Sequence, residues 1–573
     1  MLTGLYLLTF VAAWLIVRAV QKYTSLCSAS RAFGAACPYA GVVLLHPFRD
    51  LSIVLGPWFP FKGQFGYYFA RFSFYLEHGS TCIGSVTLSG SIPTLWLADA
   101  QAIKTIATET AIFQKDVVAY ETLNIYGPNM VGTEGADWKR HRKVANPAFN
   151  EEIIFLFGLI TFSDVIVQAS NAFVWMETVR VANEWFAEMD AKTKPDSSIT
   201  IDAPQYLVQA TLLVVASAGF GRRASWKENS STTPPAGHKL AFRAAVSIAL
   251  EHLFFRALTP KWIHALSIRV RLPFLGHALA ETRESFEALR LHMVELVSLS
   301  RAWVVGGKVS NMDAGLLRNL VEANMTQEDD VHHKKLTDDE LLSDIFTFLL
   351  AGHETSAHSL SFAVGLLALY PAVQQKIYKE TMRIWPDGCP TSASPSSYKE
   401  YFPKLQYTLA TFHETLRLFT PVARLSKIAH ADTTLTAHRF TPGLDVVTPF
   451  DVPVRAGSMV VIDVLALHMN PMYWGHDVED FRPERFVDTE TYRWPRDAFF
   501  GFSGGPRSCI GQRFALAESV CMLASLVRRY EILVPKHLAG KSFSEQKRTL
   551  LKWKPGVTVT PTDCVVRLKR RDV

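Results

Sequence analysis

The apolar and polar positions of this 573-residue chain follow a helical period over most of its length and alternate along a few short stretches. Apolar residues recurring every three to four positions predict helices, and strict alternation predicts strands. The segments predicted as helical are 64–78, one starting at Asp99, 151–220, 337–370, 376–385 and 407–419. Those predicted as strands are a hairpin over 83–97, a strand pair around Gly457 and a terminal hairpin within 532–568. This pattern predicts a mainly α protein with a small β region, of the α+β class.

The longest predicted helix starts at a capping box, Thr337-Asp-Asp-Glu340, and meets no breaker before Pro371. Its length is roughly 50 Å, enough to cross a whole domain. Its middle interrupts the apolar run with Ala351-Gly-His-Glu-Thr355. Glycine inside a helix costs about 1 kcal/mol relative to alanine, so a functional reason is expected. The structural alternative is a kink or a threonine hydroxyl bonded back to its own helix.

The N-terminal segment 2–20 reads LTGLYLLTFVAAWLIVRAV and carries no charge before Arg18. It is at the lower length limit for a membrane-spanning helix. A signal peptide would need a basic n-region and a small-residue cleavage site, and neither is evident. Because Arg18 and Lys22 follow the apolar run, the rest of the chain is expected in the cytosol. We expect an anchor over 1–21, a membrane-proximal hinge over 22–60 and a single catalytic domain over 61–573.

Composition narrows the class of protein. The chain is 49% hydrophobic and 20% charged, with 37 Phe, 17 Tyr and 13 Trp, as expected of a packed globular protein. A net charge of +6, dispersed along the chain, is too mild to indicate nucleic acid binding. Seven scattered cysteines give no disulfide framework and favour a reducing, cytosol-facing compartment.

Glycines, aromatics and one cysteine are concentrated in the segment 499–511, FFGFSGGPRSCIG, just before a predicted helix. Glycines at this density let a flat ligand approach the backbone. Cys509 lies where the loop becomes a helix, and the unpaired N–H groups of a first helical turn favour a thiolate. A lone thiolate suits haem iron better than zinc, which needs several clustered Cys or His ligands. A buried structural cysteine beside a glycine turn is the alternative.

The motif Phe502-x-x-Gly505-x-Arg507-x-Cys509-x-Gly511 resembles the haem-thiolate loop of the cytochrome P-450 monooxygenases, in their membrane-anchored, eukaryotic microsomal type. The resemblance extends from about residue 60 to the end of the chain. It implies the P-450 fold, a triangular helical prism with the haem between a long central helix and the cysteine loop. It also implies haem b (iron protoporphyrin IX) as cofactor, with Cys509 as the axial ligand of the iron.

The same resemblance assigns residues to the haem propionates. Trp138 and Arg142, four apart and thus on one helix face, match the family's propionate clamp. Arg507 and Lys427 would also hold propionates; the family often has arginine at the second position, and Arg424 is a competitor. On the outer face of the same helix a basic group could dock an acidic reductase, although a solvated face is an equal alternative. That group is Lys139, Arg140 and Lys143.

In the long helix, the resemblance implies an oxygen-activation groove. Gly352 would leave room for dioxygen, the Thr355 hydroxyl would donate to the distal oxygen, and Glu354 would relay protons from water. Glu414, Arg417 and Arg485 match the family's buried Glu-Arg-Arg lock and are therefore structural.

The function implied is a haem-thiolate monooxygenase of the endoplasmic reticulum membrane, single-pass, with its catalytic domain facing the cytosol. It would insert one atom of dioxygen into an apolar organic substrate, in secondary metabolism. Electrons would come from a separate NADPH-dependent flavoprotein reductase, since no flavin or nucleotide motif is found. The expected partners are this reductase, the substrate and membrane lipid, without nucleic acid. A haem-thiolate enzyme that rearranges peroxides and a non-enzymatic haem-binding membrane protein are alternatives, and the Glu354-Thr355 pair argues against both.

Overall fold

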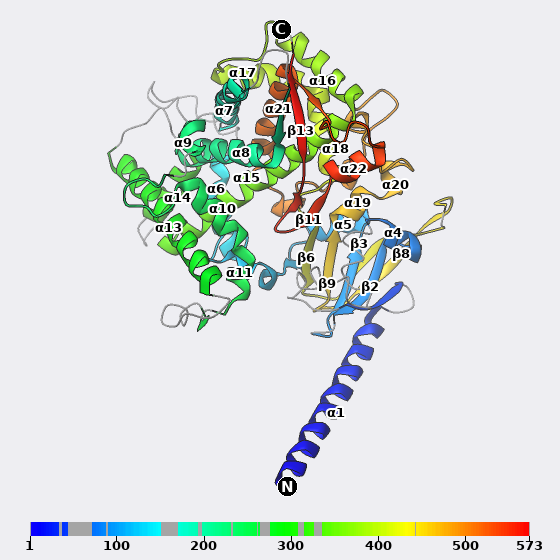
Figure 1. Ribbon diagram of the computed structural model, residues 1–573. Helices are drawn as coiled ribbons and strands as arrows, with labels where there is room; N and C mark the ends of the chain where they lie inside the picture. The colour runs from blue at the N-terminus through cyan, green and yellow to red at the C-terminus, as the bar shows by residue number, and fades with distance from the viewer. Residues whose placement is uncertain are drawn as a thin grey trace, which may run out of the picture. The chain divides into compact units, whose positions relative to one another are not determined.

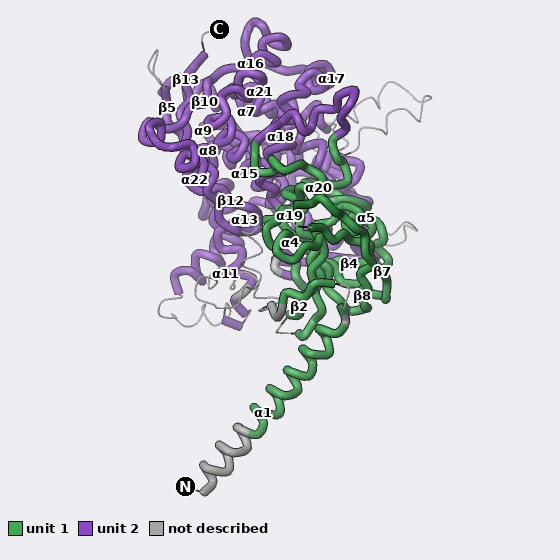
Figure 2. The backbone as a smooth tube through the Cα atoms, turned by 90° about the vertical axis from the view of Figure 1, so that its right-hand side faces the viewer, with its two compact units in different colours: residues 1–119, 422–480, 494–509 green, residues 120–421, 481–493, 510–573 purple. Residues whose placement is uncertain are grey.

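The structure is a computed structural model of the 573-residue chain. The residues it describes are 2–33, 37–43, 71–87, 90–149, 170–192, 198–230, 233–260, 262–263, 276–306, 315–325, 335–441 and 443–571. The chain forms two compact units, each built from distant parts of the sequence (Figure 2). Unit 1 comprises 1–119, 422–480 and 494–509, and unit 2 comprises 120–421, 481–493 and 510–573. Helices dominate and the sheets are small, so the predicted mainly α class with a small β region is confirmed (Figure 1).

Unit 1 is organised around a six-stranded sheet of order β1-β2-β3-β9-β6-β4. Its strands are β1 Tyr39–Val43, β2 Cys82–Thr87, β3 Pro93–Leu97, β9 Met459–Asp463, β6 Arg424–Ala429 and β4 Phe113–Lys115. The hairpin predicted over 83–97 is confirmed, because β2 and β3 are antiparallel with Ile83 opposite Trp96. Strand β9 lies between β3, to which it is parallel, and β6, to which it is antiparallel.

The strand pair predicted around Gly457 is wrong in its pairing. Strand β8 (Val447–Val454) pairs with β7 (Thr433–Phe440) in a separate two-stranded sheet, whereas β9 enters the large sheet. Gly457, at a φ of 82°, turns the chain from one sheet to the other. Alternation identifies a strand but not its partner, which explains the error.

Asp99 caps α5 (Ala100–Thr108), as predicted, and does more than the sequence indicated. Its Oδ1 accepts hydrogen bonds from the backbone N–H groups of Gln101 at 3.0 Å and Ala102 at 3.1 Å. Its Oδ2 accepts from Thr81 Oγ1 at 2.8 Å and lies 2.7 Å from His438 Nδ1. One fully buried carboxylate therefore ties α5 to both sheets of unit 1.

The N-terminal helix α1 runs from Leu2 to Ser30, nine residues past the expected end of the anchor at 21. Residues 22–30, which were predicted to begin the hinge, are therefore helical. They contain no proline or glycine that would end the helix. Of the remaining hinge, 34–36 and 44–60 lie outside the described residues. Between residues 13 and 23 the apolar side chains of α1 are exposed, with Ile16 at 64% and Trp14 at 50%. The predicted helix 64–78 is described as α4 (Ser73–His78) from residue 73 onward.

The core of unit 2 is the 32-residue helix α15 (Asp338–Leu369), which begins at the predicted capping box. Thr337 Oγ1 accepts from Glu340 N at 3.2 Å, and Glu340 Oε2 accepts from Thr337 N at 2.9 Å. The helix packs against α8 (Ala203–Phe220), α18 (Gln406–Leu418) and α21 (Gln512–Arg529) (Figure 1). Among fully described residues, α8 has the length and apolarity of a membrane span, but 72% of it is buried, as in a core helix.

The other elements of unit 2 surround this core. Its helices include α6 Gly135–Ala145, α7 Ser170–Lys192, α9 Trp226–Ser230, α10 Phe242–Glu251, α11 Leu253–Leu258, α13 Gly276–Val305, α14 Gly315–Met325, α16 Pro371–Ile384, α17 Pro395–Tyr401 and α22 Phe543–Leu550. Unit 1 also contains α19 Val464–His468 and α20 Pro471–Trp474. Short 3₁₀ turns include Pro483–Phe486 and Gly505–Arg507.

The terminal hairpin is confirmed: β10 (Tyr530–Leu533) and β13 (Val565–Arg570) pair antiparallel, with Ile532 opposite Leu568. A smaller pair is formed by β11 Trp553–Pro555 and β12 Val559–Pro561. The third strand beside β13 is β5 (Ser198–Asp202), inside the stretch predicted as helical over 151–220. The five residues of β5 are too few for their alternating pattern to be recognised within a long apolar stretch. Residues 150–169 and 193–197 of the same stretch lie outside the described residues.

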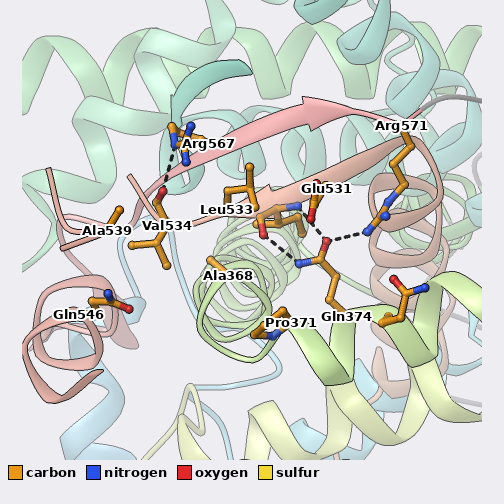
Figure 3. A pocket seen from close by; sticks show the side chains of 12 residues that line it. Ala368, Pro371, Gln374, Glu531, Leu533, Val534, Ala539, Gln546, Arg567 and Arg571 are labelled. Atoms are coloured by element: carbon orange, nitrogen blue, oxygen red, sulfur yellow. Dashed lines mark hydrogen bonds between the residues drawn. The ribbon is translucent and has the colours of Figure 1, made fainter. Parts of the chain in front are cut away.

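A pocket of about 330 Å³ lies where β10 and β13 meet the start of α16 (Figure 3). Gln374 spans one side of it, donating to Ile532 O and accepting from Ile532 N, both at 2.9 Å. Its Oε1 also accepts from Arg571 Nη2 at 2.9 Å, and Arg567 Nε donates to Val534 O at 3.0 Å. These polar groups serve each other and the backbone, so the pocket wall is a structural joint between sheet and helix.

Candidate functional site

The cysteine loop closes through its own backbone. Cys509 N donates to Phe502 O at 2.8 Å, and Ser508 N donates to Gly505 O at 3.0 Å, across the 3₁₀ turn Gly505–Arg507. Cys509 is an exposed cysteine, and α21 begins three residues later, after Gly511 as its N-cap. The loop thus presents one thiol outward from a closed backbone frame.

Gly505 fixes this loop against α5. Its φ is +65°, and a Cβ on it would lie 2.2 Å from the carbonyl oxygen of Ala107. Neighbouring Ser503 is also held at a positive φ, +60°. On the other side, Phe500 N donates to His468 Nε2 at 2.8 Å, and the His468 ring stacks on Phe499. The loop is therefore positioned by backbone contacts that only glycine permits.

Gly505→Ala should displace the loop. The left-handed backbone costs an L-residue about 1–2 kcal/mol, and overlap with Ala107 adds to that. We expect a fall in haem retention, measured as haem content per chain after gel filtration. The matched control is Gly540→Ala, where no atom lies within 4 Å of the added Cβ. Equal haem content in both variants would contradict the close approach.

Helix α6 carries the predicted propionate clamp. Trp138 is buried and Arg142, one turn later, is half-buried, whereas Lys139 and Lys143 are exposed. The prediction for Arg140 is wrong, because it does not face outward. Its two terminal nitrogens contact Glu340 at 2.5 Å and 3.0 Å, and Nη1 also donates to Lys335 O at 2.7 Å.

A buried histidine next to the clamp was missed from the sequence. His141 Nδ1 lies 2.6 Å from Asp344 Oδ2, and the other oxygen of Asp344 accepts from Met130 N at 2.9 Å. Both side chains are fully buried, so this pair fixes α6 on α15. In the sequence His141 is hidden within the run Lys-Arg-His-Arg-Lys, which looks like a solvated basic face.

The middle of α15 differs in two respects from what was expected. A Cβ on Gly352 would lie 3.2 Å from Val215 of α8, so this glycine lets two helices pack closely and does not open space for dioxygen. The exposed position is its neighbour, Ala351. The Thr355 hydroxyl donates to Ala351 O at 2.7 Å, the back-bonded alternative. Its oxygen lone pairs remain able to accept a proton or hydrogen bond.

Glu354 is the group in this helix most suited to proton transfer. Its Oε2 is buried and has no hydrogen-bond partner among the described residues. Burial raises the pKa of its carboxyl to about 7. A carboxyl group with that pKa is partly protonated at neutral pH and can both donate and accept a proton.

A second buried carboxyl was missed. Glu518 on α21 has both oxygens buried without a hydrogen-bond partner in the described structure. Burial raises its pKa to about 8, with the Ser356 hydroxyl of α15 opposing the shift. An acidic residue inside an apolar helical run was the available sequence indication. Buried unpartnered oxygens such as these usually bind ordered water.

The three residues of the predicted lock are brought together in unit 2. Glu414 accepts from Arg417 Nε at 2.6 Å and Nη2 at 2.8 Å, and also from the backbone N–H of Arg482 at 3.0 Å. Arg485 Nε is 3.5 Å from Glu414 Oε1, and all three lock side chains are buried.

Strand β6 carries both candidates for the second propionate ligand. Lys427 is buried, and its Nζ donates to Phe113 O at 3.4 Å. Arg424 lies 3.4 Å from Asp463 Oδ2 and stacks over the Trp96 ring. Arg424 therefore already has a carboxylate partner, whereas Lys427 has a weak bond to a carbonyl.

The cysteine loop fits a haem iron. Among the described residues, no set of three His, Cys or acidic side chains gathers at Cys509, as a zinc site would need. A single outward thiol at a helix start, on a glycine backbone, is the donor set of a haem-thiolate protein. Comparison with known proteins agrees: the family model of cytochrome P450 matches residues 86–560, a range that extends over both units. The chain belongs to the cytochrome P450 family.

Individual relatives carry the same description. The chain is 35% identical to cytochrome P450 monooxygenase 124 of Postia placenta, over 93% of this chain and 95% of that protein. It is 25% identical to cytochrome P450 monooxygenase prx9 of Penicillium rubens, over 79% of this chain and 76% of that protein. A bifunctional cytochrome P450/NADPH–P450 reductase of Bacillus subtilis is 28% identical over 56% of this chain and 27% of its own length. The protein is therefore a P450-type monooxygenase with a haem-iron cofactor, acting on an organic substrate and dioxygen.

Proposed function

We propose that this protein is a membrane-anchored monooxygenase that inserts one atom of dioxygen into an apolar organic substrate, using electrons from a separate NADPH-dependent flavoprotein reductase. The observation that carries the proposal is Glu354, next to Thr355 in the middle of α15, whose buried Oε2 has no hydrogen-bond partner among the described residues. A haem carrier has no use for such a group, whereas oxygen activation consumes protons.

Cys509 would hold the iron of haem b, whose thiolate ligation favours O–O bond cleavage. Its exposed thiol in the closed loop supports this role. Phe502, Gly505 and Gly511 would shape the loop against the macrocycle. The propionates would be held by Trp138, Arg142, Arg507 and one basic residue of β6. We assign that last role to Lys427, because Arg424 is already paired with Asp463.

Proton delivery would use Glu354 in its protonated form and the oxygen of Thr355. Because the pKa of Glu354 is about 7, the carboxyl carries a proton below neutrality and loses it as pH rises through that value. The Thr355 oxygen, whose own proton points at Ala351 O, would accept a hydrogen bond from water and so help to place it. Gly352 takes no direct part, since it packs on Val215.

Glu354→Gln should uncouple the enzyme. The amide keeps the shape but cannot transfer a proton, so product per NADPH should fall severalfold while hydrogen peroxide rises. In the wild type, coupling should decline as pH rises past about 7, and this inflection should vanish in the variant. Glu322→Gln, on the outside of α14, is the control. An unchanged pH profile in Glu354→Gln would remove Glu354 from the relay.

Two supporting assignments follow. The exposed Lys139 and Lys143 on α6 present positive charge for an acidic reductase. The exposed apolar side chains of α1, including Leu15 and Val17, are suited to lipid, and Arg18 follows them. We therefore propose single-pass anchoring in the endoplasmic reticulum membrane, with the catalytic part facing the cytosol.

The test is reconstitution with a flavoprotein reductase, NADPH and ¹⁸O₂, beside the reduced carbon monoxide difference spectrum. We expect a far red-shifted Soret band in the carbon monoxide spectrum. We also expect product that contains one ¹⁸O atom, and no product when the reductase is left out. Product formed from an organic hydroperoxide alone, with no reductase-dependent product, would establish the rearranging enzyme instead. Bound haem without the shifted band would favour the haem-binding protein.

A further inference from the structure

Two histidines and a glutamate, none of which has been given a role above, gather where the loop before α10 meets α13 in unit 2. One ligand atom from each of His238, His292 and Glu295 lies within 4.8 Å of the other two. His292 and Glu295 are one turn apart on α13, and His238 lies in the loop before α10. The two imidazole rings stack with centroids 3.9 Å apart.

The hydrogen bonds around His292 leave one of its nitrogens available. Nε2 lies 3.0 Å from the carbonyl oxygen of Leu240, which can only accept, so Nε2 carries the proton. Nδ1 of the neutral ring then has a free lone pair. The edge-on ring of Phe242 helps to fix this orientation. A carbonyl bonded to the far nitrogen of a histidine is the usual support of a metal-ligating imidazole.

His238 also has an unused nitrogen. Its Nδ1 is buried without a hydrogen-bond partner among the described residues, and its Nε2 lies 3.3 Å from Glu295 Oε2. The backbone is fixed here by a turn in which His238 N donates to Pro235 O at 3.0 Å, with Gly237 at a φ of +85°. The loop thus places Nε2 of His238 beside Glu295, and Nε2 is therefore the nitrogen positioned to bind an ion.

We propose that His238, His292 and Glu295 bind a zinc ion that links the loop before α10 to α13. Two imidazoles and a carboxylate, with water completing a tetrahedron, form an accepted zinc ligand set. Ligands of tetrahedral zinc lie about 3.3–3.5 Å apart, given metal–ligand distances of about 2.0–2.2 Å. Nε2 of His238 and the Glu295 carboxylate already meet this spacing. Because imidazole lone pairs lie in the ring plane, the His238 ring must turn out of its stack on His292 before both rings can bind one ion, and the exposed Glu295 side chain can follow it.

Charge at the site is balanced. The Arg222 guanidinium, stacked on Phe242 at 4.1 Å, opposes a cation near His292, and the Glu295 carboxylate offsets it. Zinc would then link the loop before α10 to α13.

The test uses the full-length, haem-loaded, tag-free protein after chelator treatment, titrated with zinc by calorimetry and elemental analysis. One zinc per chain is expected, with metal–nitrogen and metal–oxygen distances of about 2.0–2.2 Å by X-ray absorption. His238→Ala and Glu295→Gln should each weaken binding by at least about tenfold, while the carbon monoxide spectrum confirms that they remain folded.

The matched control is His277→Ala. His277 is an exposed histidine on the same helix, with Nδ1 3.6 Å from Glu281 Oε2. His252 Nε2 lies 3.4 Å from the same oxygen, but among the described residues these three side chains do not form a compact ligand group. Its zinc affinity should equal that of the wild type. Absence of stoichiometric zinc binding in the wild type, unchanged binding in His238→Ala and Glu295→Gln, or loss of binding in His277→Ala would each overturn the site.

Discussion

Replacing Cys509 by serine should abolish the red-shifted Soret band of the reduced carbon monoxide complex and reduce monooxygenase activity to background. Cys509 is the exposed thiol of the loop, and serine has the same shape but no thiolate to donate electron density. The backbone bond from residue 509 to Phe502 O does not depend on the side chain, so the loop itself should persist. Difference spectra and haem content per chain measure the effect.

The control for this experiment is Cys389→Ser. Cys389 is also a free cysteine, half-buried, with its sulfur 3.2 Å from Ser525 O, outside the loop. It should keep the full band. If Cys509→Ser lost haem altogether, circular dichroism would show whether the chain had unfolded. A folded serine variant that retained the shifted band would exclude Cys509 as the ligand.

Arg417→Met should destabilise the protein by about 3–5 kcal/mol, the usual cost of removing one partner from a buried ion pair. Arg417 makes both of the short side-chain bonds to Glu414, and Arg485 is 3.5 Å away. Burial raises the pKa of Glu414 and Arg417 is the main influence against it, so the variant carboxyl should titrate at still higher pH. The midpoint of urea unfolding, followed by circular dichroism and haem absorbance, measures the loss.

The direction of the pH effect separates this lock from ordinary packing. A carboxyl whose pKa is raised in the folded state destabilises it progressively as pH rises through that pKa. The deficit of Arg417→Met should therefore be larger at pH 8 than at pH 5. Lys404→Met, which breaks a surface pair with Glu400 at 3.7 Å, should cost at most about 1 kcal/mol. A similarly small cost for Arg417→Met would mean that Arg485 alone satisfies Glu414.

Local features of the fold were predictable from the sequence. The start of α15 at Thr337, the cap at Asp99 and the β2–β3 hairpin each depend on neighbouring residues, and each was confirmed. The partner of β9 depends on β3, far away in the chain, and was predicted wrongly. The length of α1 was underestimated because the hinge was predicted for 22–60 as a whole, whereas residues 22–30 contain neither proline nor glycine and continue the helix.

In the candidate site, too, contacts between neighbours in the sequence were predictable and contacts between distant residues were not. The Glu414–Arg417 contact follows from a spacing of three, whereas Arg485 entered only through the family resemblance. Arg140 and His141 looked like a basic surface because their acidic partners, Glu340 and Asp344, lie about two hundred positions away. Gly352 suggested open space since the sequence does not show that Val215 fills it. Spacing identifies candidate residues, and only tertiary packing decides what they face.

The interleaving of the two units has a consequence for biosynthesis. Unit 1 cannot complete its sheet until β6, β9 and the cysteine loop have been made, and these follow nearly all of the helices of unit 2. During translation, β3 therefore waits with an unpaired edge for the parallel strand β9. An unpaired strand edge can pair with other chains, so this edge must be protected from aggregation until β9 has been made.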